Sequence, residues 1–439
     1  MSIQQHSTES LCYFEVSVDN TFNQPLTDTL GKVIIKNSIK NVYGIFQLVF
    51  HVDNQLFITR NLYGQNIIKL GIKYSDINGN AKPDDSIEVE LIILEVNLPL
   101  TPKSYDNITN HKDNQQRIVV MTCIPKVAYE IMSTAVNRLW DEEISLFDAV
   151  KQLCKDAGAM SNCNVEECGK NCSTLDQLLV PPMSLNKALD DLNNRYGIFE
   201  NEMFKYVRYD GKFEMWDILK HYKTNLDGEV YIHKVPTYAP DILIDTPHEY
   251  ANQFKNHFVT YDTVETLNLT NDYLIKNGCL QTYIYHPEYD IAHYINVDVS
   301  GSVTDHGIIH KSKDIKMQQT MKQRLVVDDS LIGITKEPHG NQIKNNPIDR
   351  RVNQQLMSLN KLKFTLIRQL KIKELMKVGH VLYFKPYAEH EVFKGSNYEG
   401  AYLILDSEIT LSRMKGSQLT DQVDSKALIV ASRTNQSYN

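Results

Sequence analysis

The stretch CNVEECGKNC, residues 163–172, concentrates cysteines in a chain that has seven. Cys163, Cys168 and Cys172 stand in it, and Cys154 lies just upstream. A structural zinc site takes four ligands in tetrahedral geometry, most recognisably as two CxxC pairs, and this stretch contains no CxxC. Cys154 falls in the apolar stripe of an expected helix, where a buried thiol packs as a small hydrophobic side chain. The spacing therefore favours a loop without a metal site, although zinc binding and a disulfide both stay open for these cysteines.

A second stretch, DINGNAKPDDSIE, begins like the loop of a calcium-binding EF-hand. Asp76, Asn78 and Asn80 occupy alternate positions, as the first ligands of such a loop do. However, Ala81 stands where the loop requires glycine, and Ile87 stands at the twelfth position, where glutamate is needed. The pattern therefore predicts a solvated hairpin loop and no calcium site.

Signatures of enzymatic nucleophiles and of phosphate-binding loops are missing from the sequence. It contains no GxSxG, no HExxH and no Walker motif. The carboxylate pairs Asp84-Asp85 and Asp328-Asp329 lie in polar stretches, without the apolar surroundings that tune a general acid. His380, within VGHVLYF, is interpreted as a turn residue. The sequence therefore predicts a protein that is not an enzyme, with no catalytic residue and no cofactor.

The composition is that of an ordinary globular protein. The chain has 439 residues and a net charge of -8, which argues against binding by neutralisation of phosphates. Residues 301–380 differ, with 15 Lys and Arg against 7 Asp and Glu, and are interpreted as a partner interface or as solvated strands. The start lacks an apolar signal core, and the longest apolar run, IEVELIILEVNL, carries glutamates and is too short to span a membrane. We therefore expect synthesis in a cytosol, no membrane segment and no disulfide framework.

The first 110 residues have the pattern of antiparallel strands. The runs KVIIKNSIKNVYGIFQLVFHV, NQLFITRN, NIIKLGIKYSD and IEVELIILEVNL are rich in Val, Ile and Phe, and polar stretches separate them. Short strands at this spacing predict a small antiparallel β-barrel over residues 1–110.

Residues 111–235 are expected to form an α+β domain. Apolar residues at every fourth position between 127 and 139 predict a helix over 126–140. Ser145, followed three residues later by Asp148, resembles a capping box and begins a helix over 145–158. A third helix is expected over 184–197.

The same domain contains a strong hairpin signal. Asp210-Gly211 lies between the aromatic-rich runs EMFKYVRY and KFEMWDI. Because Asp-Gly favours tight turns between strands, we expect a β-hairpin over residues 202–217.

The remainder is expected to be mostly strands. Residues 236–310 form a β-rich segment shared between a second barrel and a small insert domain. Residues 311–415 form a helical connection, with a helix over 312–325, and then the second barrel, built from KLKFTLIRQLKI, VLYFKP and AYLILDSEITLSR. Residues 416–439 are interpreted as a polar C-terminal tail that frays.

The order of these elements resembles one protein family. SLFDAVKQLCKDAG, followed by VPPMSLNKALDDLNNRYGIFENEMFKYVRYDGKFEMWDI, resembles the middle of the baseplate hub proteins of contractile-tailed, T-even-like bacteriophages. LKFTLIRQLKIKELMKVGHVLYFKP resembles their second barrel, and LFITRNLYGQNIIKLGIKYSD their first. No single motif is diagnostic, and the combination and its order carry the resemblance. The family's pattern requires no cysteines where this chain has them.

The resemblance implies both a fold and a function. The fold is a β-rich α+β arrangement, with two tail-tube-like antiparallel β-barrel domains and α+β domains inserted around and between them. The function is that of a homotrimeric symmetry adaptor in the virion, which joins the sixfold tail tube to the threefold central spike and forms part of the channel for genome delivery. Expected partners are two further copies, the tail tube and tube-initiator proteins, the trimeric spike, inner baseplate wedge proteins and the tape measure protein. Genome DNA would pass without sequence-specific binding, and no membrane is involved.

Two other functions remain open at this stage. A tail-associated peptidoglycan hydrolase would need a paired acid and base in a cleft, for which no sequence candidate exists. A receptor- or carbohydrate-binding tail protein would make use of the 24 tyrosines, which in β-rich proteins are more often half-buried strand residues.

Overall fold

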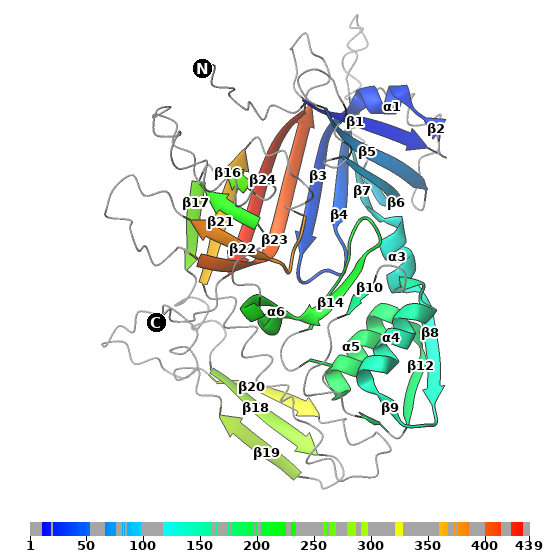
Figure 1. Cartoon of the computed structure of the whole chain (residues 1–439), viewed down its shortest axis with the longest axis vertical. Helices are drawn as coiled ribbons and strands as arrows, with labels where there is room; N and C mark the ends of the chain where they lie inside the picture. The colour runs from blue at the N-terminus through cyan, green and yellow to red at the C-terminus, as the bar shows by residue number, and fades with distance from the viewer. Residues whose placement is uncertain are drawn as a thin grey trace, which may run out of the picture.

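Strands dominate the described parts of the chain (Figure 1). The computed structural model describes residues 11–18, 21–52, 66–75, 81, 83, 86–97, 117–159, 163–165, 174–175, 177–196, 198–199, 203–224, 230–233, 258–260, 263–268, 279–286, 291–296, 321–327, 360–367, 373, 376–385, 400–413 and 423–432. Within these ranges, no helix is long and apolar enough to cross a membrane.

The N-terminal part folds into seven strands and one short helix. These are β1 (Leu11–Val18), β2 (Thr21–Phe22), α1 (Gln24–Thr29), β3 (Leu30–Ser38), β4 (Ile45–Val52), β5 (Ile67–Ser75), β6 (Ile87–Asn97) and β7 (Arg117–Pro125). All of their pairings are antiparallel, in the order β3-β4-β7-β6-β5-β1-β2. β7 lies beyond the expected boundary at residue 110 and pairs with both β4 and β6.

The C-terminal part contributes the other seven strands of the same sheet. These are β15 (Val230–His233), β16 (Phe258–Thr260), β17 (Thr263–Asn268), β21 (Asn360–Ile367), β22 (Val381–Lys385), β23 (Gly400–Arg413) and β24 (Val423–Ser432). One branch runs β23-β24-β21-β17 and the other β23-β22-β15-β16. The branches approach each other again where β16 contacts β21. This part of the sheet is therefore strongly curled.

The two parts join into one 14-stranded sheet because β23 pairs with β3. At the far end of β23, the guanidinium of Arg413 donates hydrogen bonds to the carbonyls of Thr27 and Asp28, at 2.7 and 2.8 Å. Side chains alternate along the strands, so that one face is buried and the other is partly exposed, as in β3. The buried faces of both parts share a single hydrophobic core. In Figure 1, β1 and β5 run across the view while β3 and β23 run down it, which shows the curl.

An α+β lobe lies below the large sheet in Figure 1. Its elements are α3 (Lys126–Ser133), β8 (Ala135–Trp140), β9 (Ile144–Ser145), α4 (Leu146–Asp156), β10 (Cys163–Val165), β11 (Thr174–Leu175), β12 (Leu178–Ser184), α5 (Leu185–Tyr196), β13 (Met203–Val207), β14 (Phe213–Asp217) and α6 (Ile218–Thr224). The lobe has its own hydrophobic core, which the helices α4 and α5 share with the inner faces of β8 and β12. A separate three-stranded sheet contains β18 (Cys279–His286), β19 (Ile291–Asn296) and β20 (Met321–Val327).

Several local predictions are confirmed. α4 begins after Ser145, whose hydroxyl accepts a hydrogen bond from the Asp148 amide, and the chain leaves the helix through Gly158 at φ 82°. α5 covers residues 185–196. β13 and β14 form the expected hairpin, and Gly211 in its turn adopts φ 82°.

The helix expected over 126–140 is wrong beyond Ser133. The backbone turns at Thr134, which has ψ 128°, and residues 135–140 form β8, paired with β12. The four-residue spacing of apolar side chains predicts a helix, but an even spacing also fits one face of a strand. Leu139, expected on the helical stripe, is 62% exposed, whereas Val136 and Trp140 are buried.

Two further predictions are also wrong. The expected polar tail over 416–439 contains β24, whose buried Val423, Ala427, Ile429 and Ala431 alternate with half-exposed or exposed residues. Pairing with both β23 and β21 places this strand inside the sheet. The helix expected over 312–325 is contradicted at its C-terminal end, because residues 321–327 form β20 in parallel pairing with β18.

Candidate functional site

The hairpin of β13 and β14 is buried on both faces. All ten residues of its two strands are buried. Phe204, Tyr206 and Trp216 belong to the core of the large sheet, whereas Met203 and Phe213 belong to the core of the lobe. The hairpin is therefore the element through which the lobe and the large sheet are packed together.

Buried charged side chains lie on both faces of the hairpin. On the lobe side, the ammonium of Lys205 lies 2.6 Å from a carboxylate oxygen of Asp190 and donates to the Asn186 carbonyl at 2.9 Å. Burial lowers the pKa of Lys205, while Asp190 opposes this shift. On the sheet side, opposite Tyr206 in the register, stands Glu214, which is 1% exposed.

Three basic or ionisable side chains surround Glu214. Oε2 lies 3.1 Å from Nε2 of His380, and Oε1 lies 3.4 Å from the Lys212 ammonium and 3.6 Å from the Arg208 guanidinium. Burial alone would raise the pKa of Glu214, but the contacts with His380, Arg208 and Lys212 outweigh it and hold the pKa below its ordinary value. Glu214 is therefore held as a carboxylate.

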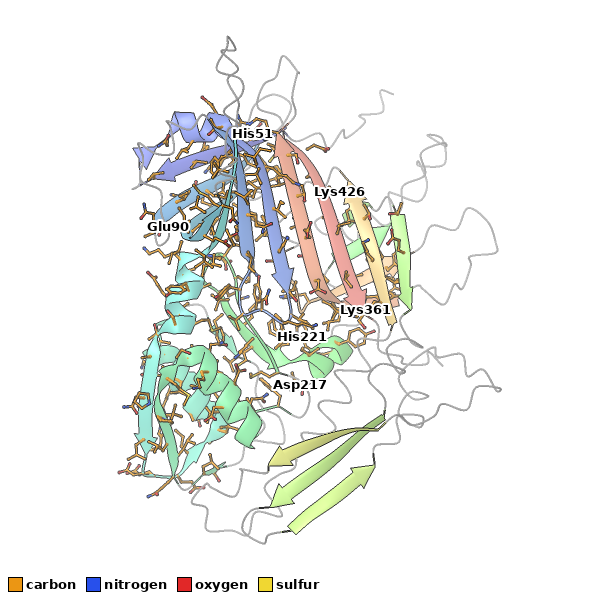
Figure 2. The ribbon with its side chains drawn as sticks, turned by 180° about the vertical axis from the view of Figure 1, so that it is seen from behind. His51, Glu90, Asp217, His221, Lys361 and Lys426 are labelled. Atoms are coloured by element: carbon orange, nitrogen blue, oxygen red, sulfur yellow. The ribbon has the colours of Figure 1, made fainter. Side chains whose placement is uncertain are left out.

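His380 reaches this position from the C-terminal part of the chain. It follows Gly379, whose φ of 77° belongs to the left-handed region and whose absent side chain leaves room for the ring of Phe204. Its ring contacts Trp216 edge-on, with centroids 5.1 Å apart. Trp216 also stacks on His221 of α6, at 4.4 Å. Figure 2 shows His221 and Asp217 below the lower ends of the sheet strands.

A second polar link ties the same hairpin to both parts of the large sheet. The Tyr206 hydroxyl donates to Oδ1 of Asn37 on β3 at 2.7 Å, and the Asn37 amide donates to the Ser407 hydroxyl on β23 at 3.1 Å. Burial raises the pKa of Tyr206 well above its ordinary value, so the hydroxyl stays protonated and can donate. The junction formed by Glu214, His380 and their neighbours thus links the hairpin to both parts of the large sheet through buried polar contacts.

Among the residues singled out in the sequence, the structure places His380, Cys154 and Cys163. His380 lies beside the turn as expected, but its buried pairing with Glu214 was missed, because the two lie 166 positions apart. Cys154 is fully buried in α4, as its place in the apolar stripe predicted. Cys163 begins β10, while Cys168 and Cys172 lie outside the described residues. No metal-ligand cluster occurs among the residues that are described.

The other sequence candidates belong to two polar stretches, each with a pair of neighbouring carboxylates. Asp76, Asn78 and Asn80 of the EF-hand-like stretch lie outside the described residues. The carboxylate pairs at 84–85 and 328–329 also lie outside them.

The pKa of Glu214 leads to a prediction for acid stability. Because the folded state lowers this pKa, the ion pairs contribute stability above the unfolded value near 4.5, and the contribution is lost as the pH falls through the folded pKa. We expect the contribution of Glu214 to the urea-unfolding midpoint to be present above about pH 5 and to fall below it. Glu214→Gln should flatten part of this fall, and an unchanged pH profile in the variant would contradict the assignment.

The edge strands of the large sheet form the second candidate site. Among the described strands, β2 pairs only with β1, β16 only with β15, and β17 only with β21. At an edge strand, another chain can add a strand by backbone hydrogen bonding. On the edge strand β17, Glu265 forms an exposed ion pair with Lys363 of β21, at 3.1 Å.

Comparisons with known proteins find similarity only at the level of structure. No protein-family model and no curated protein matches the chain. A tail protein from Neisseria meningitidis MC58 aligns with a TM-score of 0.49 at 10% identity, over 96% of each chain. A 43 kDa tail protein of prophage MuSo2 from Shewanella oneidensis aligns with a TM-score of 0.49 at 8% identity, also over 96% of each chain. A Francisella PdpA–VgrG complex in its half-lidded form gives 0.46 at 10% identity, over 98% of this chain and 60% of that one.

Proposed function

We propose that the chain is the structural hub of a bacteriophage tail baseplate, a homotrimer that joins a sixfold tail tube to a threefold central spike. One observation carries the proposal: a single chain holds two curled parts of one sheet, fused edge to edge through β3 and β23. If each part acts as one tube-like barrel, three chains present six such barrels around a threefold axis. A trimer of this kind matches both symmetries at once.

In this proposal, the edge strands β2, β16 and β17 provide the contacts between copies. Pairing of the edge strand β2 of one copy with the edge strands β16 and β17 of the next would close a ring. In the same proposal, tube and tube-initiator proteins, inner wedge proteins and the tape measure protein contact the ring on the tube side, and the spike contacts it on the other. The genome then passes through the lumen, and the protein resides in the virion.

The proposed role is not enzymatic. A peptidoglycan hydrolase requires a carboxylic acid that can release its proton to the substrate. The two buried carboxylates of the described residues are Glu214 and Asp217. Glu214 is held by three neighbouring groups, and Asp217 accepts a hydrogen bond from the Lys220 amide at 3.0 Å at the start of α6. Both therefore have structural partners, which supports the structural role over the hydrolase.

Oligomer mass tests the proposal. Light scattering of the purified chain, over a range of concentrations, is expected to give three times the chain mass of 50.5 kDa. Symmetry-resolved imaging of the particle should then place three copies on the tail axis. A chain that remains monomeric when tube and spike proteins are produced with it would overturn the proposal.

A further inference from the structure

The two-stranded ribbon of β8 and β12 has an apolar outer face. Its inner face belongs to the core of the lobe, to which both strands contribute. On the outer face, Leu139 and Leu179 lie directly opposite each other in the register, with 62% and 58% of their surfaces exposed. Ala135 and Asn137, also exposed on β8, are uncharged. A strand face that meets only water usually carries polar or charged side chains, so this leucine pair marks a candidate contact surface.

Both strands of the ribbon also have a free edge. Within the described strands, β8 pairs only with β12, and β12 pairs only with β8. Two strands alone are marginally stable and gain from further packing or pairing. A chain that covers the leucine pair can therefore also form backbone hydrogen bonds along either edge.

Acidic side chains adjoin the leucine pair. Asp141, Glu142 and Glu143 follow β8 directly, and all three are exposed. Residues 126–200, which contain most of the lobe, have seven Lys and Arg against twelve Asp and Glu, a net charge of -5. A surface that complements this one is therefore apolar at its centre and basic around it.

The chain itself has a basic side. Residues 301–380 have a net charge of +8, and the stretch includes β21, with the half-exposed Lys361 and Lys363. β21 pairs with the edge strand β17. Lys363 also pairs with Glu265, so the attraction is that of two oppositely charged surfaces and needs no unpaired lysine.

The acidic and the basic sides face in opposite directions. Figure 1 shows β2 and β8 along one side of the molecule and β16 and β17 along the other. In Figure 2, seen from behind, Lys361 and Lys426 lie across the large sheet from Glu90. Joining the β2 side of one copy to the β17 side of the next therefore brings the acidic lobe of the first toward the basic side of the second.

We propose that the outer face of the β8–β12 ribbon docks against a second copy of this chain, on the side of β17 and β21. The inference rests on the proposed trimer and adds a contact of the lobe to those of the edge strands. Each copy would use its leucine pair on one neighbour and its basic side on the other, an arrangement that can close into a ring. The leucines contribute because they are removed from water, and the charges orient the copies.

Dilution of the full-length chain tests the contact. Leu139→Thr/Leu179→Thr keeps residues suited to strands. Its trimer is expected to dissociate at a concentration at least about tenfold higher than that of the parent chain, because two leucines are no longer buried between copies. Analytical ultracentrifugation measures the dissociation, and an unchanged urea midpoint shows that the variant is folded.

The matched control is Leu94→Thr/Ile118→Thr. It removes two side chains of the same size, 50% and 48% exposed, from β6 and β7 of the large sheet. This control is expected to associate like the parent chain. Equal weakening in both double variants would overturn the proposal. A trimer that Leu139→Thr/Leu179→Thr leaves unchanged would also overturn it, while the hub proposal would stand.

A photoreactive benzoylphenylalanine in place of Leu139 identifies the occupant. Illumination of the purified full-length chain should give a product of twice the chain mass, with the linked peptide in the C-terminal part of the other copy. Crosslinks that form only within one chain, or only to tube or spike proteins when these are present, contradict the proposal. A chain that never associates with itself, alone or with those proteins, overturns both this contact and the hub. A dimer that depends on the leucine pair supports the contact and contradicts the trimer.

Discussion

Alanine in place of Glu214 is expected to lower the free energy of unfolding by about 3 kcal/mol, because breaking a buried ion pair on one side leaves its partners uncompensated. The carboxylate is 1% exposed and holds His380, Lys212 and Arg208 on the sheet side of the hairpin. Its loss removes the charged contact between the lobe and the C-terminal part of the large sheet at this point. Urea unfolding followed by tryptophan fluorescence measures the effect, since Trp216 lies in the same junction.

The matched control for this variant is Glu265→Ala. Glu265 also pairs with a lysine, Lys363, at 3.1 Å, but its side chain is 56% exposed. Exposed pairs contribute between about 0 and 1 kcal/mol, so this control should unfold almost like the parent chain. Equal losses of stability in the two variants would show that burial of Glu214 does not set its contribution.

Gly379→Ala is the second variant for which we expect a large effect. The backbone at this position has φ 77°, where an L-residue costs about 1–2 kcal/mol. An added Cβ would also lie 2.6 Å from two ring atoms of Phe204. Because Phe204 is fully buried, its ring cannot move aside without disturbing the core, and such overpacking costs about 1–3 kcal/mol more. The summed loss is therefore about 2–5 kcal/mol, measurable as a lower urea midpoint.

Gly158→Ala provides a control that differs in one respect. Gly158 has nearly the same backbone conformation, φ 82°, but nothing lies within 4 Å of an added Cβ. It should lose only the conformational part, about 1–2 kcal/mol. The difference between the two variants measures the steric contact with Phe204, and the absence of a difference would show that the ring relaxes freely.

Local signals predicted the elements of the lobe well. The cap at Ser145, the exit at Gly158 and the turn at Gly211 each depend on residues within a few positions of one another, and all three occur as expected. In such cases backbone preference and hydrogen-bonding chemistry act over one turn of chain, which a single sequence displays directly.

The missed features depend on partners far away in the chain. The polar residues around 416–439 predict a tail, yet β24 within it is stabilised by pairing on both sides with strands formed by earlier residues. The contact between Glu214 and His380 spans 166 positions, and no local pattern marks either residue. Burial of a charge is decided by tertiary packing, so sequence spacing alone could not predict the contact between Glu214 and His380.

The pairing of β3 with β23 constrains the order in which the chain folds. The hydrogen bond from Asn37 to Ser407 closes a loop of 370 positions. During synthesis, β3 therefore emerges long before the strand that covers its edge, and the sheet can be completed only when β23 and β24 have left the ribosome. Contacts this distant in sequence form slowly, and the waiting edge is open to pairing with other chains. Prematurely terminated chains, which lack β23, should therefore aggregate rather than accumulate as a stable N-terminal half.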